Sequence, residues 1–214
     1  MKESLYNYIA IEGNIGAGKT SLSKLIASDF NAKLILEEFE DNSFLPKFYK
    51  DPERYAFPLE LSFLAERYQQ LKDSISNRDL FMPFTVSDYL VTKSLIFARK
   101  TLQTDEYNLY KKLFEIIHQS IPSPDLFVYL HVKVENLQRN IKKRGREYEQ
   151  NISDEYLTSI QESYFDFIRQ QTGMRILIID TNEMDFVNKE TDYQMIKEII
   201  FKEYETGVHR ITPK

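Results

Sequence analysis

Short apolar runs recur along the chain and alternate with longer stretches in which apolar residues return every three or four positions. The runs have the length and composition of buried strands, and they cover residues 8–11, 33–36, 84–86, 126–132 and 175–179. The stretches with helical spacing cover residues 19–29, about 52–75, 90–102, 107–119, 134–143, 154–171 and 193–203. Strands that alternate with helices predict an α/β fold, in which a five-stranded parallel sheet carries helices on both faces. The polar tail after Glu203 predicts no regular element.

The chain shows no internal repeat, low-complexity tract or linker, so residues 1–214 are expected to form a single domain. A net charge of −5 argues against a nucleic-acid polymer as partner, because such partners usually require a basic surface. The absence of cysteine excludes disulfides, thiolate metal sites and thiol nucleophiles. No apolar leader begins the sequence and no stretch is long enough to span a bilayer. A cytoplasmic enzyme without membrane contact is therefore expected.

The first predicted strand runs directly into a glycine-rich segment that fits G-x-x-x-x-G-K-[ST]. Its residues are Gly13, Asn14, Ile15, Gly16, Ala17, Gly18, Lys19 and Thr20. Between a strand and a helix, such a loop turns its backbone N–H groups toward phosphate oxygens. Lys19 would then reach the β- and γ-phosphates, and the Thr20 hydroxyl would ligate Mg²⁺. A glycine-rich turn with a chance lysine is the alternative, and the strand–helix context argues against it.

Acidic residues follow the second and third predicted strands, and ligands in parallel α/β folds bind beyond these strand ends. Glu37 is the first of four acids in residues 37–41, and it could act as a general base on an acceptor hydroxyl. The alternative for this segment is a solvated loop. Asp88 is a candidate for the second Mg²⁺ contact, although an Asp there could equally cap the next helix.

Residues 139–151 are rich in cations although the whole chain is acidic, and Gly145 interrupts them. Arg144 and Arg146 could belong to a lid that closes over phosphates, because the guanidinium fork binds phosphate oxygens in pairs. A solvated basic face is the alternative. The loop at 180–185 resembles a guanine-reading N-K-x-D motif with Glu183 at the lysine position, so we interpret it as a loop near a nucleotide base.

Several segments together resemble the deoxynucleoside kinases, which include the bacterial deoxyadenosine/deoxyguanosine kinases and the related deoxycytidine kinases. The similar segments are I-E-G-N-I-G-A-G-K-T at 11–20, the acids at 37–38, Y-K-D-P-E-R-Y-A-F-P-L at 49–59, S-L-I-F-A at 94–98 and K-R-G-R-E-Y-E-Q at 143–150. The resemblance covers roughly residues 5–182. The glycine-rich loop alone is shared by many enzymes, but its combination with this lid is much more specific.

The resemblance implies a P-loop NTPase fold and transfer of the γ-phosphoryl group of ATP–Mg²⁺ to the 5′-hydroxyl of a deoxynucleoside. Glu37 matches the catalytic carboxylate of the family, and Arg144 and Arg146 match lid arginines that contact the phosphates. The acceptor would be bound by Glu37, Tyr49, Phe57, Glu60, Phe97 and Glu149. Among these, Tyr49 and Glu149 match positions that hold the sugar 3′-hydroxyl, and Phe97 matches a ring that stacks on the base. The resemblance also implies a homodimer with a helical interface.

The chain departs from the family pattern at two positions. Where the family has Asp/Glu-Arg-Ser after the third strand, this chain has Ser87-Asp88-Tyr89, and Lys93 could replace the missing arginine. Glu60 occupies the position of a base-reading glutamine. A carboxylate only accepts hydrogen bonds, which favours guanine, with its N1–H and 2-amino donors, over adenine. The alternatives are that Glu60 points to solvent, pairs with Arg67, or is protonated.

Two other functions remain compatible with the sequence. A nucleoside monophosphate kinase of the thymidylate kinase type would need cations for the phosphate of its acceptor, and residues 37–60 offer few, namely Lys47, Lys50 and Arg54. A regulatory module would bind nucleotide without turnover. The set of Lys19, Thr20, Glu37 and the lid arginines favours an enzyme, since a binding module does not need it.

Overall fold

The computed structural model describes residues 5–37, 42–75, 81–119 and 121–213. Its centre is a six-stranded sheet in the order β2-β3-β1-β4-β5-β6, and all the pairings between these strands are parallel. The strands are β1 (Tyr8–Gly13), β2 (Lys33–Ile35), β3 (Thr85–Ser87), β4 (Leu126–His131), β5 (Arg175–Asp180) and β6 (Gly207–Ile211). The predicted α/β class, the parallel sheet and the first five strands are confirmed.

The sixth strand corrects the prediction for the tail after Glu203. β6 lies at the edge of the sheet and pairs with β5 from Arg175 opposite Gly207 to Ile179 opposite Ile211. Its side chains are half-buried or exposed, so it lacks the apolar run that identified the other strands. Such an edge strand is held mainly by backbone hydrogen bonds to its neighbour, which the hydrophobic pattern of a sequence does not report.

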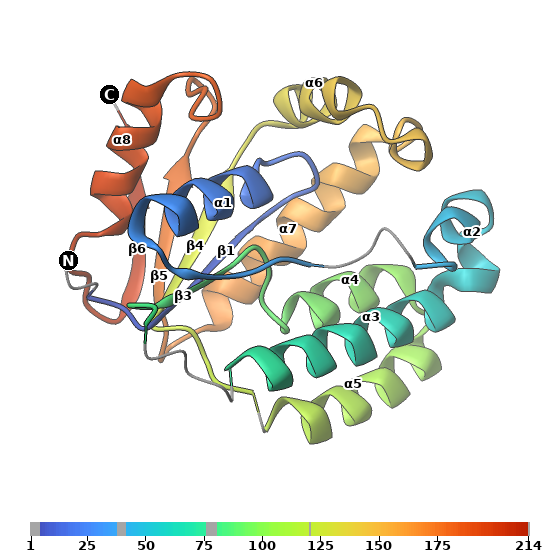
Figure 1. Cartoon of the computed structure of the whole chain (residues 1–214). Helices are drawn as coiled ribbons and strands as arrows, with labels where there is room; N and C mark the ends of the chain where they lie inside the picture. Colours follow the sequence, from blue (N-terminus) through green and yellow to red (C-terminus); the bar gives the residue numbers. More distant parts are fainter. Residues whose placement is uncertain (1–4, 38–41, 76–80, 120, 214) are drawn as a thin grey trace.

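Helices cover both faces of the sheet, as predicted (Figure 1). They are α1 (Lys19–Phe30), α2 (Leu45–Lys50), α3 (Pro52–Ile75), α4 (Lys93–Thr101), α5 (Thr104–His118), α6 (Val134–Arg144), α7 (Asp154–Gln170) and α8 (Glu190–Ile200), with a short 3₁₀ helix at Glu147–Glu149. The short helix α2 was not predicted. α4 begins three residues later than expected, because residues 90–92 form the turn that leads into it.

β1 shows how the two faces are built from one strand. Ile9 and Ile11 pack in one buried cluster with Leu22 and Ile26 of α1, and residues of α8 belong to the same cluster. The side chains between them, Tyr8 and Ala10, face the opposite cluster, which α4 and α7 cover. Because both faces of the sheet are buried, the sequence of the strand is a continuous apolar run and does not alternate between apolar and polar residues.

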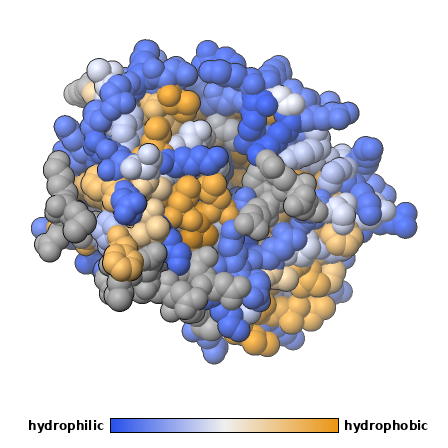
Figure 2. Space-filling model, viewed as in Figure 1, coloured by the Kyte–Doolittle hydropathy of each residue, from blue (hydrophilic) through white to orange (hydrophobic). Residues whose placement is uncertain are grey.

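A third cluster joins α3, α4 and α5 into a helical layer beside the sheet, and these three helices lie side by side in Figure 1. On the outer side of this layer, the α5 residues Leu109 and Ile116 are exposed, and Figure 2 shows the apolar patch over that helix. Apolar residues also show near the middle of this face, and charged and polar residues cover much of the rest. None of the helices in the described part of the chain combines the length and apolarity that a membrane span requires.

Candidate active site

The glycine-rich loop joins β1 to α1 at the carboxyl end of the sheet, where the sequence predicted a ligand site. The Lys19 ammonium donates to the Asn14 carbonyl oxygen at 3.0 Å, and the Asn14 amide donates to the Leu157 carbonyl oxygen at 2.7 Å. Gly16 has a φ of +83°, and a Cβ on it would lie 2.9 Å from the Leu137 carbonyl oxygen of α6. The loop is therefore fixed on one side by α7 and leaves no room for a side chain on the other.

Gly16→Ala is expected to lower the free energy of unfolding more than Gly145→Ala does. Both glycines have left-handed φ values, which cost another residue about 1–2 kcal/mol, but nothing lies within 4 Å of a Cβ at Gly145. The clash at Gly16 is with backbone, which raises the expected loss to about 2–5 kcal/mol in total. Urea unfolding of both variants measures the difference. Equal losses would contradict the close approach to α6.

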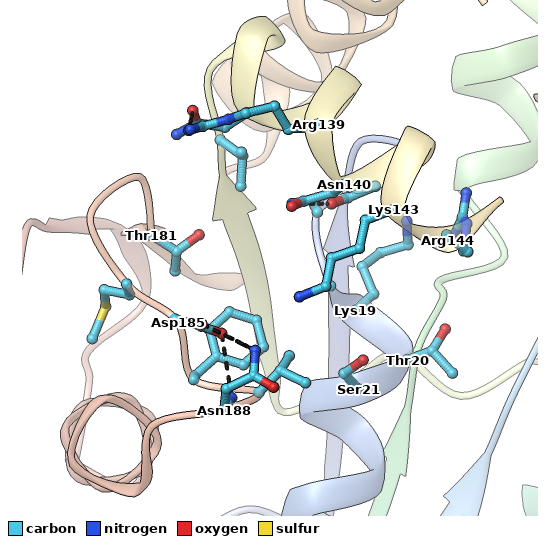
Figure 3. A pocket seen from close by; sticks show the side chains of 18 of the residues that line it. Lys19, Thr20, Ser21, Arg139, Asn140, Lys143, Arg144, Thr181, Asp185 and Asn188 are labelled. Carbon is cyan, nitrogen blue, oxygen red and sulfur yellow. Dashed lines mark hydrogen bonds between the residues drawn. The ribbon is translucent and has the colours of Figure 1, made fainter. Parts of the chain in front are cut away.

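A cavity of about 560 Å³ opens between the glycine-rich loop, α6 and the loop that follows β5 (Figure 3). Residues 16–21 form its floor, and Arg139, Asn140 and Lys143 of α6 line one wall. The opposite wall contains Thr181, Asn182 and residues 184–188. Figure 3 shows Lys143 reaching from α6 into this space toward Asp185, whose carboxylate accepts from the Asn188 side chain. The 180–185 loop, which the sequence predicted to lie near a nucleotide base, thus lines the same cavity as the glycine-rich loop.

Lys19 is half-buried and lines this larger cavity. Burial lowers the pKa of Lys19 to about 8, and the nearby charge of Lys93 acts in the same direction. Above that pH the Lys19 amine is mostly neutral in the protein without bound nucleotide. A bound polyphosphate would favour the ammonium form, because opposite charges at close range stabilise each other.

Binding of a nucleoside triphosphate at about pH 8.5 is therefore expected to take up between about half a proton and one proton per site. Calorimetry in two buffers that differ in ionisation enthalpy measures this uptake. Lys19→Arg retains the charge but does not titrate, so it should bind without proton uptake. Lys24→Met, which changes an exposed lysine of the same helix, should leave the uptake unchanged. Equal uptake by wild type and Lys19→Arg would contradict the assignment.

A smaller cavity, of about 110 Å³, lies on the other side of the glycine-rich loop. Most of the predicted acceptor residues line it, namely Glu37, Tyr49, Glu60, Phe97 and Glu149. Lys19, Thr20, Arg144 and Arg146 line both cavities. The two spaces therefore meet at a lysine, a hydroxyl and two arginines, which is where a group passing from one space to the other would be held.

The Glu37 side chain is 10% exposed and lies between two cations. Arg67 donates from Nε at 2.8 Å and from a terminal nitrogen at 2.5 Å to one carboxylate oxygen, and Lys93 Nζ donates to the other at 2.6 Å. Burial alone would raise the pKa of Glu37, but the charges and hydrogen bonds of Lys93 and Arg67 outweigh it and hold the pKa well below its usual range. The carboxylate is therefore ionised at neutral pH. Its neighbour residues 38–41 lie outside the described part of the chain.

Asp88 contacts Thr20, the other residue predicted to bind Mg²⁺. The Thr20 hydroxyl donates to one Asp88 oxygen at 2.5 Å, and the Glu37 backbone N–H donates to the other at 2.7 Å. No group of three or more acidic or histidine side chains in the described residues is placed to hold a metal ion. A hydroxyl and one carboxylate fit Mg²⁺, which takes few protein ligands and completes its octahedron with phosphate oxygens and water.

The lid arginines converge on Glu149. Arg144 forms an ion pair with one oxygen of the buried Glu149 carboxylate, and a terminal nitrogen of Arg146 lies 3.4 Å from the other. Tyr148 in the same segment stacks on Tyr49 of α2, with ring centroids 6.0 Å apart. These contacts place the 139–151 segment over the junction of the two cavities.

Glu60 is buried, so the interpretation that it points to solvent was wrong. One of its oxygens accepts from the Thr101 hydroxyl at 2.9 Å, while Arg67 is bound to Glu37 and not to Glu60. Burial is the main cause that raises the pKa of Glu60 to about 7. The carboxyl group therefore changes its charge near neutral pH.

Phe57 does not line either cavity. It packs in the helical layer with Leu64 and Tyr110, and Phe63 of the same helix lines the smaller cavity instead. Six residues separate these rings, which places them on different faces of α3. Sequence spacing alone did not show which face of this long apolar helix looks into the cavity.

Two site residues were not predicted in their observed roles. Arg67 follows Glu60 by seven residues, a spacing of two helical turns that places both on one face, and this signal could have brought it into the site.

Glu12 is fully buried in β1, and its carboxylate accepts from the Leu90 backbone N–H and the Tyr164 hydroxyl, both at 2.8 Å. It thereby fixes the turn between Asp88 and Lys93 to the central strand.

Known proteins resemble this chain in sequence and in structure. A model of the deoxynucleoside kinase family matches residues 9–204. The chain is 34% identical over 193 residues to a deoxyguanosine kinase from Bacillus subtilis (strain 168), covering 88% of this chain and 93% of the relative. It is 36% identical over 191 residues to a deoxyadenosine kinase from Dictyostelium discoideum, covering 89% and 78%. The structure of a deoxyadenosine kinase from M. mycoides with bound dATP superposes with a TM-score of 0.78 at 25% identity, covering 91% of this chain and 99% of that one.

Proposed function

The chain belongs to the deoxynucleoside kinase family, and we propose that it transfers the γ-phosphoryl group of ATP–Mg²⁺ to the 5′-hydroxyl of a purine deoxynucleoside. The observation that carries this proposal is the junction of the two cavities. The larger cavity, with the glycine-rich loop as its floor, receives ATP, and the smaller one receives the acceptor. Lys19, Thr20, Arg144 and Arg146 line both and surround the group in transfer.

Phosphoryl transfer depends mainly on positioning and on charge stabilisation, because its transition state is loose and spreads charge over the phosphoryl oxygens. Lys19 neutralises part of that charge at the β- and γ-phosphates. When the nucleotide is bound, Arg144 and Arg146 leave Glu149 and bind phosphate oxygens instead. Their contact with these oxygens strengthens as negative charge develops there in the transition state. Glu149 is then free of the arginines and can accept a hydrogen bond from the sugar 3′-hydroxyl, next to Tyr49.

Glu37 acts on the acceptor hydroxyl as an ionised hydrogen-bond acceptor. Its low pKa makes it a weak base, which suits a reaction in which the nucleophile needs orientation more than early deprotonation. Lys93, whose ammonium contacts Glu37, supplies the cation that the family places after the third strand. Thr20 and Asp88 would hold Mg²⁺, which supplies charge neutralisation at the β- and γ-phosphate oxygens when bound.

The purine preference is supported by the aromatic lining of the smaller cavity, with Phe63 and Phe97, and by the similarity to deoxyguanosine and deoxyadenosine kinases. Glu60, in its carboxylate form, favours deoxyguanosine because guanine offers it two N–H donors. The family resemblance also leads us to propose a homodimer, which sedimentation velocity of the purified protein tests.

A monophosphate acceptor is less compatible with the charges of the smaller cavity. Lys47, Lys50 and Arg54 are absent from its lining, as far as the described residues define it. Of the cations that do line it, Arg67 and Lys93 are bound to Glu37, and Lys19, Arg144 and Arg146 lie at the junction with the larger cavity, where the transferred group is held. A second phosphate group would therefore have to compete with Glu37 for Arg67 and Lys93, or with the transferred group for the other three cations.

Steady-state assays with ATP–Mg²⁺ test the proposal against deoxyguanosine, deoxyadenosine, deoxycytidine, thymidine and each of their monophosphates. Turnover on a purine deoxynucleoside with a 5′-monophosphate as product is the expected result. Turnover on monophosphates alone would show a nucleoside monophosphate kinase. Nucleotide binding without turnover on any acceptor would show a regulatory module.

A further inference from the structure

We propose that Glu60 selects between the two purines through its own protonation, recognising adenine as a neutral acid and guanine as a carboxylate. The proposal rests on the proposed function and adds the group that reads the base. It assigns Glu60 as a specificity-determining residue whose preference changes with pH, while the residues that bind the phosphates and the sugar are unchanged.

The geometry leaves both oxygens of Glu60 able to bind a ligand, since one has no partner and the other uses only one of its two acceptor sites. Glu60 is 3% exposed and lines the smaller cavity together with Phe63 and Phe97. Its Oε1 accepts from the Thr101 hydroxyl, whereas its Oε2 has no hydrogen-bond partner among the described residues. A buried oxygen without a partner carries a desolvation cost, and a base in the cavity can remove that cost by supplying the missing hydrogen bond.

Ionisable and polar groups face Glu60 from every element around it. Arg67 lies on the same helix, Lys93 and Thr101 lie on α4, and Glu37 follows β2, with Tyr110, Tyr49 and Tyr156 contributed by α5, α2 and α7. The two cations bind Glu37 directly, and within the described part of the chain no salt bridge compensates a charge on Glu60. Burial raises the pKa of Glu60 most strongly, the Arg67 charge and the Thr101 hydrogen bond oppose it, and the result is about 7.

Each protonation state of Glu60 complements a different purine edge. A carboxylate accepts twice, which matches the N1–H and 2-amino donors of guanine. A neutral carboxyl group donates once and accepts once, which matches the N1 acceptor and the 6-amino donor of adenine. The opposite combinations place two acceptors or two donors together in a buried site, which should lower the rate constant kcat/KM by about tenfold to hundredfold.

The experiment measures the ratio of kcat/KM for deoxyguanosine to that for deoxyadenosine, with both nucleosides competing in one reaction. Titrations of Lys19, Glu37 or ATP affect both substrates alike, so they cancel in the ratio. Between about pH 5.5 and 8.5 the ratio should rise at least tenfold, with its midpoint near neutrality. Deoxyinosine, which has the N1–H donor but no 2-amino group, should follow deoxyguanosine. A ratio that does not change with pH would overturn the proposal.

Three variants separate this role from a structural one. Glu60→Gln presents a donor and an acceptor at every pH, so its ratio should be low and constant. Thr101→Val removes a hydrogen bond that favours the carboxylate, so the midpoint should move to higher pH while Glu60 itself is retained. Glu53→Gln, at an exposed position of the same helix, should leave the wild-type change intact. An unchanged midpoint in Thr101→Val, or a wild-type pH dependence in Glu60→Gln, would overturn the proposal.

The outcome distinguishes this inference from the proposed function. Turnover on both purines with a constant ratio retains the deoxynucleoside kinase and removes the role of Glu60. Absence of turnover on every deoxynucleoside contradicts the proposed function, and the assignment of Glu60 is then overturned with it.

Discussion

Glu37→Gln is expected to lower kcat by between about 10² and 10⁴-fold, the range that a positioned acid–base group contributes. Glutamine cannot remain anionic beside Arg67 and Lys93, and its amide presents a donor where the acceptor hydroxyl needs an acceptor. KM for ATP should change little, since Glu37 lines the acceptor cavity and not the larger one. Steady-state kinetics with the preferred deoxynucleoside measures both constants.

The same substitution should also destabilise the fold, because it leaves two buried cations without their counter-ion. Removing one partner of a buried ion pair costs about 3–5 kcal/mol. The pKa of Glu37 is lowered in the folded protein, so its stabilising contribution is fully present above its ordinary value of 4.5 and is lost as the pH falls below it. The difference in unfolding free energy between wild type and Glu37→Gln should therefore shrink on acidification.

A double variant separates the two effects of Glu37. Glu37→Gln combined with Lys93→Met removes one of the unpaired cations, so it should recover part of the stability while kcat remains low. Glu53→Gln, which changes an exposed carboxylate on α3, should alter neither quantity. Retention of near-wild-type kcat in Glu37→Gln would contradict a role for this residue in orienting the acceptor.

Arg67→Met is expected to lower the free energy of unfolding by about 3–5 kcal/mol, because Arg67 is buried and is the main hydrogen-bond donor to Glu37. Its third contact, to the Ser94 hydroxyl at 2.7 Å, links α3 to α4 and is lost as well. The remaining cation, Lys93, keeps Glu37 ionised but does not fix the plane of its carboxylate. We therefore expect kcat to fall in addition, since orientation of the acceptor requires a fixed carboxylate.

Arg54→Met provides the matched control for Arg67→Met on the same helix. Its guanidinium is exposed and lies 5.3 Å from the centre of the Tyr55 ring, so its removal should change stability by no more than about 0.5 kcal/mol. Urea unfolding of the two variants compares a buried and an exposed arginine directly. Equal stability of the two variants would show that the Glu37–Arg67 pair contributes nothing measurable.

The hydrophobic pattern predicted the strands that are buried on both faces, and it failed for β6. β1, β4 and β5 lie inside the sheet, so their side chains must be apolar almost without interruption. β6 covers one edge and leaves Val208 exposed, so its sequence resembles that of a loop. The same limit explains why Phe57 rather than Phe63 was predicted to line the acceptor cavity. α3 is long and packs against neighbours on several sides, so its apolar residues do not mark one face, and the sequence does not show which face lines the cavity.

The sequence by itself determined the fold class, the glycine-rich loop and most residues that line the smaller cavity. These depend on neighbouring residues: the glycine-rich loop uses left-handed glycines between a strand and a helix, and strand ends in a parallel sheet lie at one edge. Only the tertiary structure decided how the charges are paired. Arg67 and Lys93 lie 30 and 56 residues from Glu37 and bind it, so that Glu60 has no ion pair among the residues that the structure describes. Charge pairing and the resulting pKa values depend on distance and burial in space, which no local sequence pattern encodes.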